Sequence, residues 1–367
     1  MAKVSSIQKW VGQLNSRVPF VGKDIARSAC QKLAADKGPL TVPFLVSALA
    51  NKDQQIRTIA ENALESLTDP DALDALALGY TFTQQESLHR ILESLGRNVP
   101  VRPELSSVGQ PSAVATVSGT AEQVWQFHNK RDETLLAFVP EGDFLAGREK
   151  FRVHLPAYYL ALTCVTNTQY VKFLDRRCPD PAQLKKWINL KQCDAIYKEN
   201  NTYKVHPDKA EFPVIWTTWE GAAAYSKWAG LKLPTELEWE KGARGVDGRL
   251  YPWGDEWEAG RPRAEEGTER KPEEITSVLS YPTGRSPYGL YQMIGNVYEW
   301  CLDWYQESAY QRYSQSDLKS PQKGEHKVLR GGPWCFGTPA HLRTEYRKST
   351  VWRAGTPLCG FRCAKSL

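Results

Sequence analysis

Long apolar runs are missing from this sequence, in which no segment approaches the roughly 18 to 20 consecutive apolar residues that span a bilayer. A concentrated charge is missing as well. The net charge of +5 is small for 367 residues, and Lys and Arg form no stripe with interleaved aromatic residues. The charge pattern typical of nucleic-acid binding is therefore weak. We expect neither a membrane-spanning segment nor a nucleic-acid partner.

Closely spaced cysteines are also absent. The eight cysteines include no CxxC pair, which argues against a zinc ribbon or a thioredoxin-like motif. We expect most of these thiols to be buried as small apolar side chains. The first residues, MAKVSSIQKW, carry no apolar segment behind their charges, so a cytoplasmic protein with reduced thiols is expected.

Helical periodicity dominates the first part of the chain. Apolar residues recur at helical spacing from Asp24 to Leu95. Within this range, similar sequence segments recur about every thirty residues, a period typical of helical solenoids. The pattern predicts a small all-α, HEAT-like repeat domain over residues 1–98. Because so few repeats bury only a small core, we expect this domain to pack against the second domain or against a partner protein. The similar segments are Ile25–Ala34, Ile56–Leu67 and Leu88–Leu95.

A composition change follows. Residues 99–119 contain three prolines and several serines and show no periodicity, which is typical of a linker. Beyond it, residues 120–367 hold short apolar segments, frequent Gly and Pro, and all tryptophans except Trp10. This part of the chain predicts an α+β domain with much irregular backbone.

Local signals place several elements of the second domain. Ala137–Gly147 predicts a strand, a turn and a second strand. One helix is expected to begin near Asn167, whose amide can cap it. Thr217 and Glu220 form a possible capping box for the next helix, which Gly230 ends.

A third helix follows at once, with Thr235 in its opening and Gly242 as its end. We expect Arg330 and Arg362 to pair with internal carboxylates such as Glu238 or Glu299. Large apolar rings near glycines are expected in the core, namely Trp253, Trp300, Trp304 and Trp334.

Seven segments of the second domain resemble the formylglycine-generating enzyme family in order and spacing. They are FVPEGDFLAG, VTNTQYVKFL, FPVIWTTWEGAAAYSKWAGLKLPTELEWEKGARG, YPWGDEW, YGLYQMIGNVYEWCLDWY, VLRGGPW and GFRCA. The match covers residues 135–367. The resemblance implies a C-type lectin-like domain, an α+β fold with little regular sheet, preceded here by the helical module.

The catalytic chemistry of that family does not carry over. The resembling enzyme uses two cysteines to bind Cu(I), and the matching positions here are Phe336 and His341. Cys335 stands one place early, which along a strand points it to the opposite face. Related iron-dependent enzymes use three histidines of a helical domain, whereas this chain has only His89 before the linker. We therefore predict a protein that is not an enzyme.

A calcium site is the one cofactor that the resemblance implies. It would carry over to the side chains of Gln292 and Glu299 and to the carbonyls of Gly295 and Val297, since oxygen ligands suit a hard cation. Gln292 replaces the family's usual Asp or Asn. The alternative is a hydrogen-bonded loop without metal.

Residues 335–358 also resemble the hypervariable tract of bacterial diversity-generating retroelement variable proteins, which use the same fold. The tract lies between VLRGGPW and GFRCA and has no periodicity. Residues interleaved with Arg343, Arg347 and Arg353 would be the varied ones. The candidate ligand-binding residues are Cys335, Phe336, Thr338, His341, Tyr346, Lys348, Thr350, Val351, Trp352, Thr356 and Leu358, with the aromatic ones as anchors.

These observations predict a cytoplasmic, non-catalytic recognition protein whose C-terminal surface binds a ligand, most simply a protein. One alternative is an oxidase of the formylglycine-generating type that uses a displaced thiol pair. A second alternative is a structural adaptor that docks partners through its helical repeats.

Overall fold

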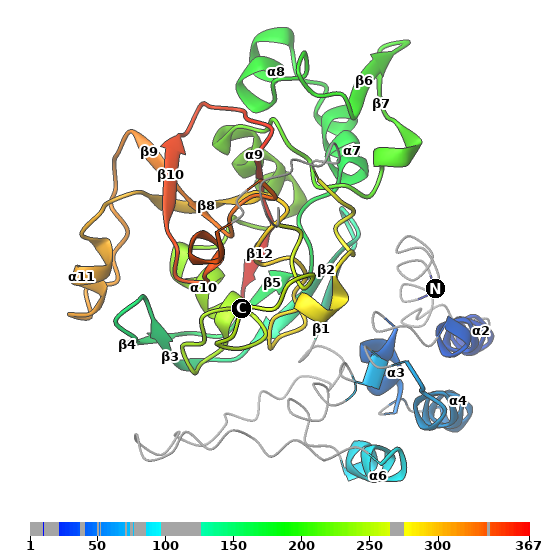
Figure 1. Cartoon of the computed structure of the whole chain (residues 1–367). Coiled ribbons are helices and arrows are strands. Elements are labelled where there is room, and N and C mark those ends of the chain that lie inside the picture. Colours follow the sequence, from blue (N-terminus) through cyan, green and yellow to red (C-terminus); the bar gives the residue numbers. More distant parts are fainter. Residues whose placement is uncertain are drawn as a thin grey trace. The chain divides into compact units, whose positions relative to one another are not determined.

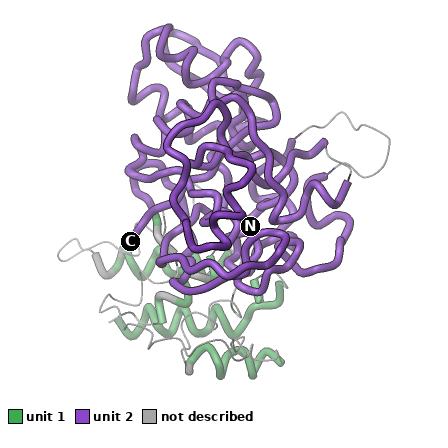
Figure 2. Tube along the Cα trace, turned by 90° about the vertical axis from the view of Figure 1, so that its left-hand side faces the viewer, with its two compact units in different colours: residues 1–128 green, residues 129–367 purple. Residues whose placement is uncertain are grey.

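A computed structural model of the chain describes residues 22–36, 41–49, 53–69, 86–96, 126–264, 275–335 and 338–367, together with residues 10, 51, 72, 73 and 76. The chain forms two compact units, residues 1–128 and 129–367 (Figures 1 and 2). The predicted linker, residues 99–119, lies outside the described residues. The predicted domain boundaries therefore stay predictions.

Residues 22–96 of the first unit are mainly helical where the structure describes them, as the periodicity predicts. Asp53 stabilises this unit in two ways. Its carboxylate caps a helix by accepting the N–H groups of Gln55 and Ile56, and it also accepts a hydrogen bond of 2.6 Å from Arg27 of another helix. Assignment of this unit to the HEAT repeats stays a prediction. Its helices are α2 (Gly22–Asp36), α3 (Val42–Ala48), α4 (Gln54–Glu65) and α6 (Glu86–Ser94).

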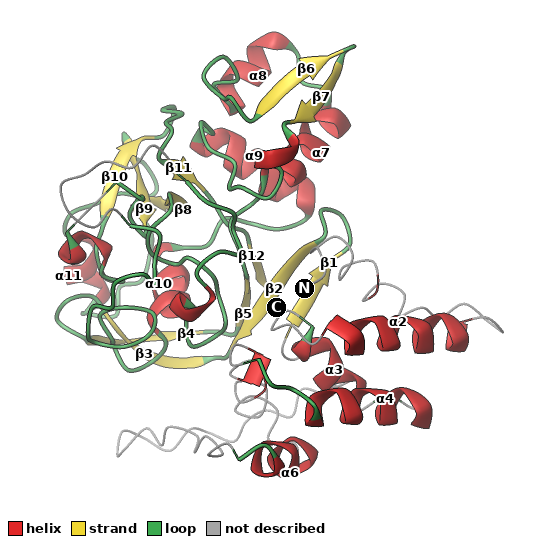
Figure 3. Cartoon of the chain, turned by 45° about the vertical axis from the view of Figure 1, so that its right-hand side comes forward, coloured by secondary structure: helices red, strands yellow, loops and turns green. Residues whose placement is uncertain are grey.

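Two four-stranded sheets organise the second unit (Figures 1 and 3). The first has the order β1 (Gln126–Asn129), β2 (Thr134–Val139), β5 (Tyr158–Ala161) and β12 (Ala364–Ser366). The second has the order β10 (Lys348–Val351), β9 (His326–Arg330), β8 (Tyr298–Trp304) and β11 (Cys359–Gly360). Because β11 joins the second sheet and β12 the first, the end of the chain ties the two sheets together.

Two hairpins complete the strands of this unit. They are β3 (Gly142–Ala146) with β4 (Phe151–Leu155), and β6 (Ile196–Glu199) with β7 (Thr202–Val205). The strand, turn and strand predicted for residues 137–147 are confirmed as β2 and β3. The helices of this unit are α7 (Asn167–Arg177), α8 (Pro181–Trp187), α9 (Trp219–Ala229), α10 (Glu236–Arg244) and α11 (Ala309–Tyr313), of which α9 and α10 contact strand β8. Among the described residues, every helix is too short or too polar to cross a bilayer.

Thr235 opens α10 as predicted, but the predicted caps of α7 and α9 were each one residue off. Thr166, not Asn167, caps α7, and it forms a capping box with Gln169. Thr218, not Thr217, caps α9 by accepting the N–H of Gly221. In both cases two adjacent polar residues can cap, and the backbone conformation decides between them.

Gly242 does not end the third predicted helix. Instead, α10 continues to Arg244, and Gly245 follows it with a φ of 72°. A Cβ atom on Gly242 would lie 2.4 Å from a methyl group of Leu160 on β5. The glycine is therefore needed for close packing of α10 on the first sheet.

Aromatic side chains fill the core, although not all of those predicted. Trp300 has no exposed surface, whereas Trp253, Trp304 and Trp334 are only half-buried. The prediction of core burial is thus correct for Trp300 and wrong for the other three. Trp239 of α10 is also fully buried, and its indole N–H donates to Glu299 at 2.8 Å.

We expect Trp300→Ala to lower the free energy of unfolding of the second unit by about 3–5 kcal/mol, because it leaves a large cavity. Trp253→Ala removes a half-buried ring and is expected to cost about 1 kcal/mol. Urea unfolding followed by circular dichroism measures both. Equal losses for the two variants would contradict this description of the core.

Candidate functional site

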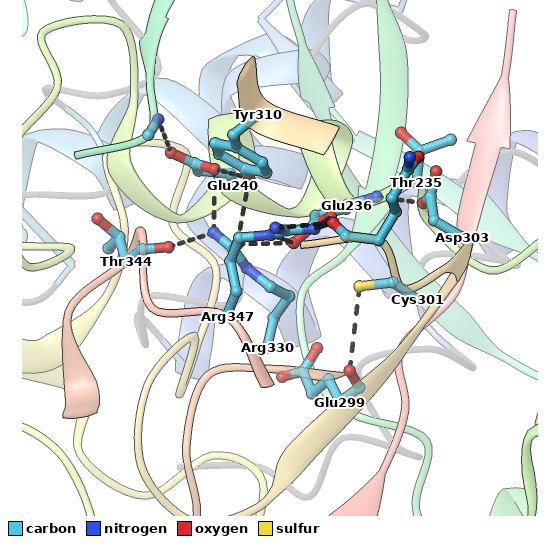
Figure 4. Close-up of polar contacts among 12 residues, drawn as sticks. Thr235, Glu236, Glu240, Glu299, Cys301, Asp303, Tyr310, Arg330, Thr344 and Arg347 are labelled. Carbon is cyan, nitrogen blue, oxygen red and sulfur yellow. Dashed lines mark hydrogen bonds and ion pairs between the residues drawn. The ribbon is translucent and has the colours of Figure 1, made fainter. Parts of the chain in front are cut away.

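A buried arginine lies under the C-terminal tract (Figure 4). Arg330, at the end of β9, donates to Glu236 and to Glu240 of α10, each at 3.0 Å. These two glutamates lie four residues apart and thus on one face of the helix. The predicted partner Glu238 is wrong for Arg330, because Glu238 pairs with Lys232 at 2.6 Å.

Arg330, Glu236, Glu240 and Tyr310 form one cluster, and its Arg and Glu side chains stay charged although they are buried. Burial disfavours the charge on Arg330, but Tyr310, Glu240 and Glu236 outweigh burial and raise its pKa. Burial likewise opposes ionisation of Glu240, while the charges of Arg330 and Arg244 overcome it and lower the pKa of that carboxyl. Tyr310 also donates its hydroxyl to Glu240. The cluster is therefore a compensated ionic network.

This network fixes the backbone of the tract at its middle. The carbonyl of Thr344 accepts a 2.5 Å hydrogen bond from Arg330, and the side chain of Thr344 is fully buried. Arg347 binds Glu236 with two nitrogens, at 2.6 and 2.9 Å. Its guanidinium group also lies 4.4 Å from the ring centre of Tyr310.

A second set of contacts fixes the end of the tract. The N–H of Trp219 donates to the carbonyl of Trp352 at 3.0 Å, and the N–H of Trp216 donates to the carbonyl of Thr356 at 2.9 Å. Gly355 permits this approach, since a Cβ atom there would lie 2.4 Å from the carbonyl oxygen of Trp216. The tract therefore follows the surface of the start of α9.

Most of the candidate ligand-binding residues predicted from the sequence have solvent-accessible surface. Phe336 lies outside the described residues. The rings of His341 and Tyr346 are in contact, with centres 5.1 Å apart. Exposed candidates are Thr338, His341, Lys348 and Val351, and half-buried ones are Cys335, Tyr346, Thr350, Trp352, Thr356 and Leu358. The structure brings them to the surface of one tract, and their role in binding stays a prediction.

Sequence reasoning missed Lys327 of β9. Its ammonium nitrogen lies 3.9 Å from the ring centres of both Trp219 and Trp304 and donates to the carbonyl of Leu302 at 2.7 Å. Trp352 of the tract then packs edge-on against Trp304, with ring centres 6.3 Å apart. Four of the five residues of HKVLR are buried, so no alternation of polar and apolar residues marks Lys327 as a position among these rings.

The expected calcium ligands are engaged within the protein. Glu299 accepts 2.6 and 2.7 Å hydrogen bonds from Arg362, its predicted partner. Gln292 donates to two backbone carbonyls and accepts from Asn296 at 2.6 Å. The carbonyl of Gly295 accepts the N–H of Val297 at 2.8 Å. An arginine paired with Glu299 does not fit a cation site, so calcium binding by this loop stays a prediction that these contacts do not favour.

No group of three or more His, Cys, Asp or Glu side chains gathers to hold a metal within the part of the chain that the structure describes.

Residues 121–367 match the sulfatase-modifying factor enzyme 1-like domain. The chain belongs to this family. The predicted resemblance to formylglycine-generating enzymes is thereby confirmed, as is the α+β fold class of the second unit.

Two curated relatives illustrate the family. A chain named serine/threonine-protein kinase pkn1 from Chlamydia caviae is 36% identical over 248 residues, which cover 64% of this chain and 38% of the relative. The formylglycine-generating enzyme of Streptomyces coelicolor is 39% identical over 192 residues, 48% of this chain and 60% of the enzyme. The chain thus spans less than two thirds of either relative.

Among solved structures, PvdO from Pseudomonas aeruginosa superposes with a TM-score of 0.50 at 19% identity, covering 66% of this chain and 98% of PvdO. Treponema denticola variable protein 1 gives a TM-score of 0.48 at 19% identity, covering 65% and 98% of the two chains. The likeness to PvdO shows a shared fold.

The lysine between the tryptophans generates a pH prediction. Burial lowers the pKa of Lys327 to about 8, opposed by Asp303, and the two indoles limit this shift because they favour the ammonium ion. Between about pH 8 and 10 the unfolded chain binds more protons at this lysine than the folded chain. Stability conferred by this position therefore rises with pH in that window, by on the order of 1 kcal/mol.

The test compares the wild type with Lys327→Met by urea unfolding at pH 8 and at pH 9.5. The difference in unfolding free energy between the two proteins is expected to shift in favour of the wild type at the higher pH. A difference that stays constant, or shifts the other way, would contradict the prediction.

Proposed function

We propose that the second unit is a non-catalytic recognition module that binds a protein ligand through residues 335–358. One observation carries the proposal: side chains such as Lys348 and Val351 are exposed, while the backbone beside them is held by buried bonds from Arg330 and Arg347. A fixed backbone loses little conformational entropy on binding, so exposed side chains can set affinity and specificity.

The chemistry at the family's cysteine positions supports the absence of catalysis. Phe336 and His341 stand where the resembling oxidase has thiols, and neither side chain supplies a thiolate for Cu(I). His341 is exposed and contacts a tyrosine ring. The position thus suits contact with a ligand.

A second candidate is an oxidase with a displaced thiol pair, and the surroundings of Tyr298 favour it. Burial raises the pKa of this tyrosine, and Tyr346, Cys359 and Cys335 raise it further, so both cysteines act on one phenol. However, burial raises the pKa of Cys359 to about 12. Metal binding needs the thiolate, which such a pKa disfavours at neutral pH.

Binding through the tract is tested with a triple variant, Tyr346→Ser, Lys348→Ser and Val351→Ser. A displayed library of protein fragments is selected on the wild type, and the enriched fragments are then titrated against the variant. We expect binding to be lost while the melting temperature falls by only a few degrees, because Lys348 and Val351 are exposed and Tyr346 is only half-buried. An exposed side chain contributes about 0.5 kcal/mol or less.

The matched control changes the same residue types on the hairpin of β6 and β7, as Tyr197→Ser, Lys198→Ser and Val205→Ser. It is expected to bind the fragments like the wild type. If the tract variant binds equally well, or if it unfolds as severely as Trp300→Ala, these side chains do not form a recognition surface and the proposal fails.

The oxidase alternative has its own test. Purified protein is incubated with a cysteine-containing sulfatase peptide, with and without copper, and the peptide is analysed by mass spectrometry. We expect no oxidised product. Product formation that disappears in Cys335→Ser and in Cys359→Ser would establish the displaced thiol pair instead.

A further inference from the structure

Strand β10 is the outer edge of the second sheet and belongs to the tract. The order of that sheet is β10, β9, β8 and β11, so β10 pairs with β9 on one side (Figure 1). On its other side, no strand among the described residues pairs with it. An edge strand presents backbone N–H and C=O groups that a further strand can pair with.

Both ends of β10 are held. Arg347, which immediately precedes the strand, binds Glu236 of α10. At the last residue of the strand, the carbonyl of Val351 accepts the N–H of Ala354 at 2.9 Å. Directly after the strand, the carbonyl of Trp352 accepts the N–H of Trp219. The edge is therefore kept extended before any ligand arrives, which reduces the entropic cost of pairing.

The register assigns the side chains of β10 to two faces. Thr350 lies opposite Lys327, which lies opposite Trp304, so these three share one face. By alternation Lys348 is on that face too, whereas Val351 is on the other. Lys348 is exposed, and Val351 is 46% exposed. An added strand would thus meet a cation on one face and an apolar side chain on the other.

Charge decides between two kinds of added strand. The exposed side chains at and after the edge include Lys348 and Arg353, and the tract contains a single acidic residue, Glu345. A second copy of this chain would bring its own Lys348 and Arg353 to the same edge, and these like charges would repel. An exposed lysine on an edge strand is a known protection against such self-pairing. A strand with acidic side chains has the complementary charge.

We propose that β10 binds an extended acidic segment of the ligand as an additional β-strand, with an acidic side chain beside Lys348 and an apolar one beside Val351. This mode of binding is β-augmentation, in which main-chain hydrogen bonds give affinity and alternate side chains give specificity. The proposal rests on the proposed function, since it uses the same surface.

The probe is a phage-displayed library of random 12-residue peptides selected on the full chain. We expect enriched peptides to contain Asp or Glu alternating with β-branched or aromatic residues. Lys348→Glu is expected to weaken their binding about tenfold, by replacing attraction with repulsion. The matched control is Lys185→Glu on α8, which is also an exposed lysine and lies far from the tract in sequence. It is expected to leave binding unchanged.

A scan of backbone N-methylation through one enriched peptide then tests strand pairing itself. In a paired strand, successive N–H groups alternate between the partner and solvent. Methylation is therefore expected to abolish binding at every second position and to leave it unchanged at the positions between. This period of two would not arise from recognition of side chains alone.

Two results would overturn the strand proposal: peptides that bind without any alternation in the methylation scan, and a library from which nothing is enriched over the unselected pool. Neither result decides the proposed function, which fails separately if folded protein fragments bind the triple variant as well as the wild type. Equal binding of enriched peptides to Lys348→Glu would also overturn the proposed role of the acidic side chain.

Discussion

The buried pairing of Arg330 with two glutamates of α10 is the contact on which the second unit depends. One guanidinium group joins β9, α10 and the carbonyl of Thr344 in the tract. Removing one partner of such a cluster leaves an uncompensated buried charge, at a cost of about 3–5 kcal/mol. Replacing the whole cluster by apolar side chains can be neutral, so the network matters chiefly for position. It determines where the tract runs.

A second arginine does the same for the junction of the two sheets. Arg362 pairs with Glu299 of β8 and donates to the carbonyls of Ala161, Leu162 and Tyr291. In a fold with long irregular segments, many buried carbonyls have no strand to pair with, and leaving one unpaired costs free energy. The arginine supplies the missing donors. Irregular backbone can therefore be as well fixed as regular sheet.

The sequence predicted the family and the α+β class of the second unit, because both rest on motifs in order along the chain. It also named Glu299 among the two carboxylates expected to pair with Arg330 and Arg362. It did not identify the partners of Arg330, because α10 is buried on all sides and its pattern does not show which glutamates face β9. Burial of Trp253 and Trp334 was overestimated, since a glycine neighbour fixes a turn but not what covers the ring. The lysine between two tryptophans depends on strand register across the sheet, which spacing along one strand does not fix.

The tract separates stability from surface chemistry within one short segment. Leu342 and Thr344 are buried, and Arg347 is tied to the ionic network, so these positions carry the backbone. His341, Lys348 and Val351 lie between or beside them with exposed side chains, where substitution costs about 0.5 kcal/mol or less. Because the two kinds of position interleave, the exposed side chains can differ without moving the chain that displays them. This separation is what the proposed recognition function requires, since the exposed side chains would contact the ligand and the buried ones keep the backbone in place.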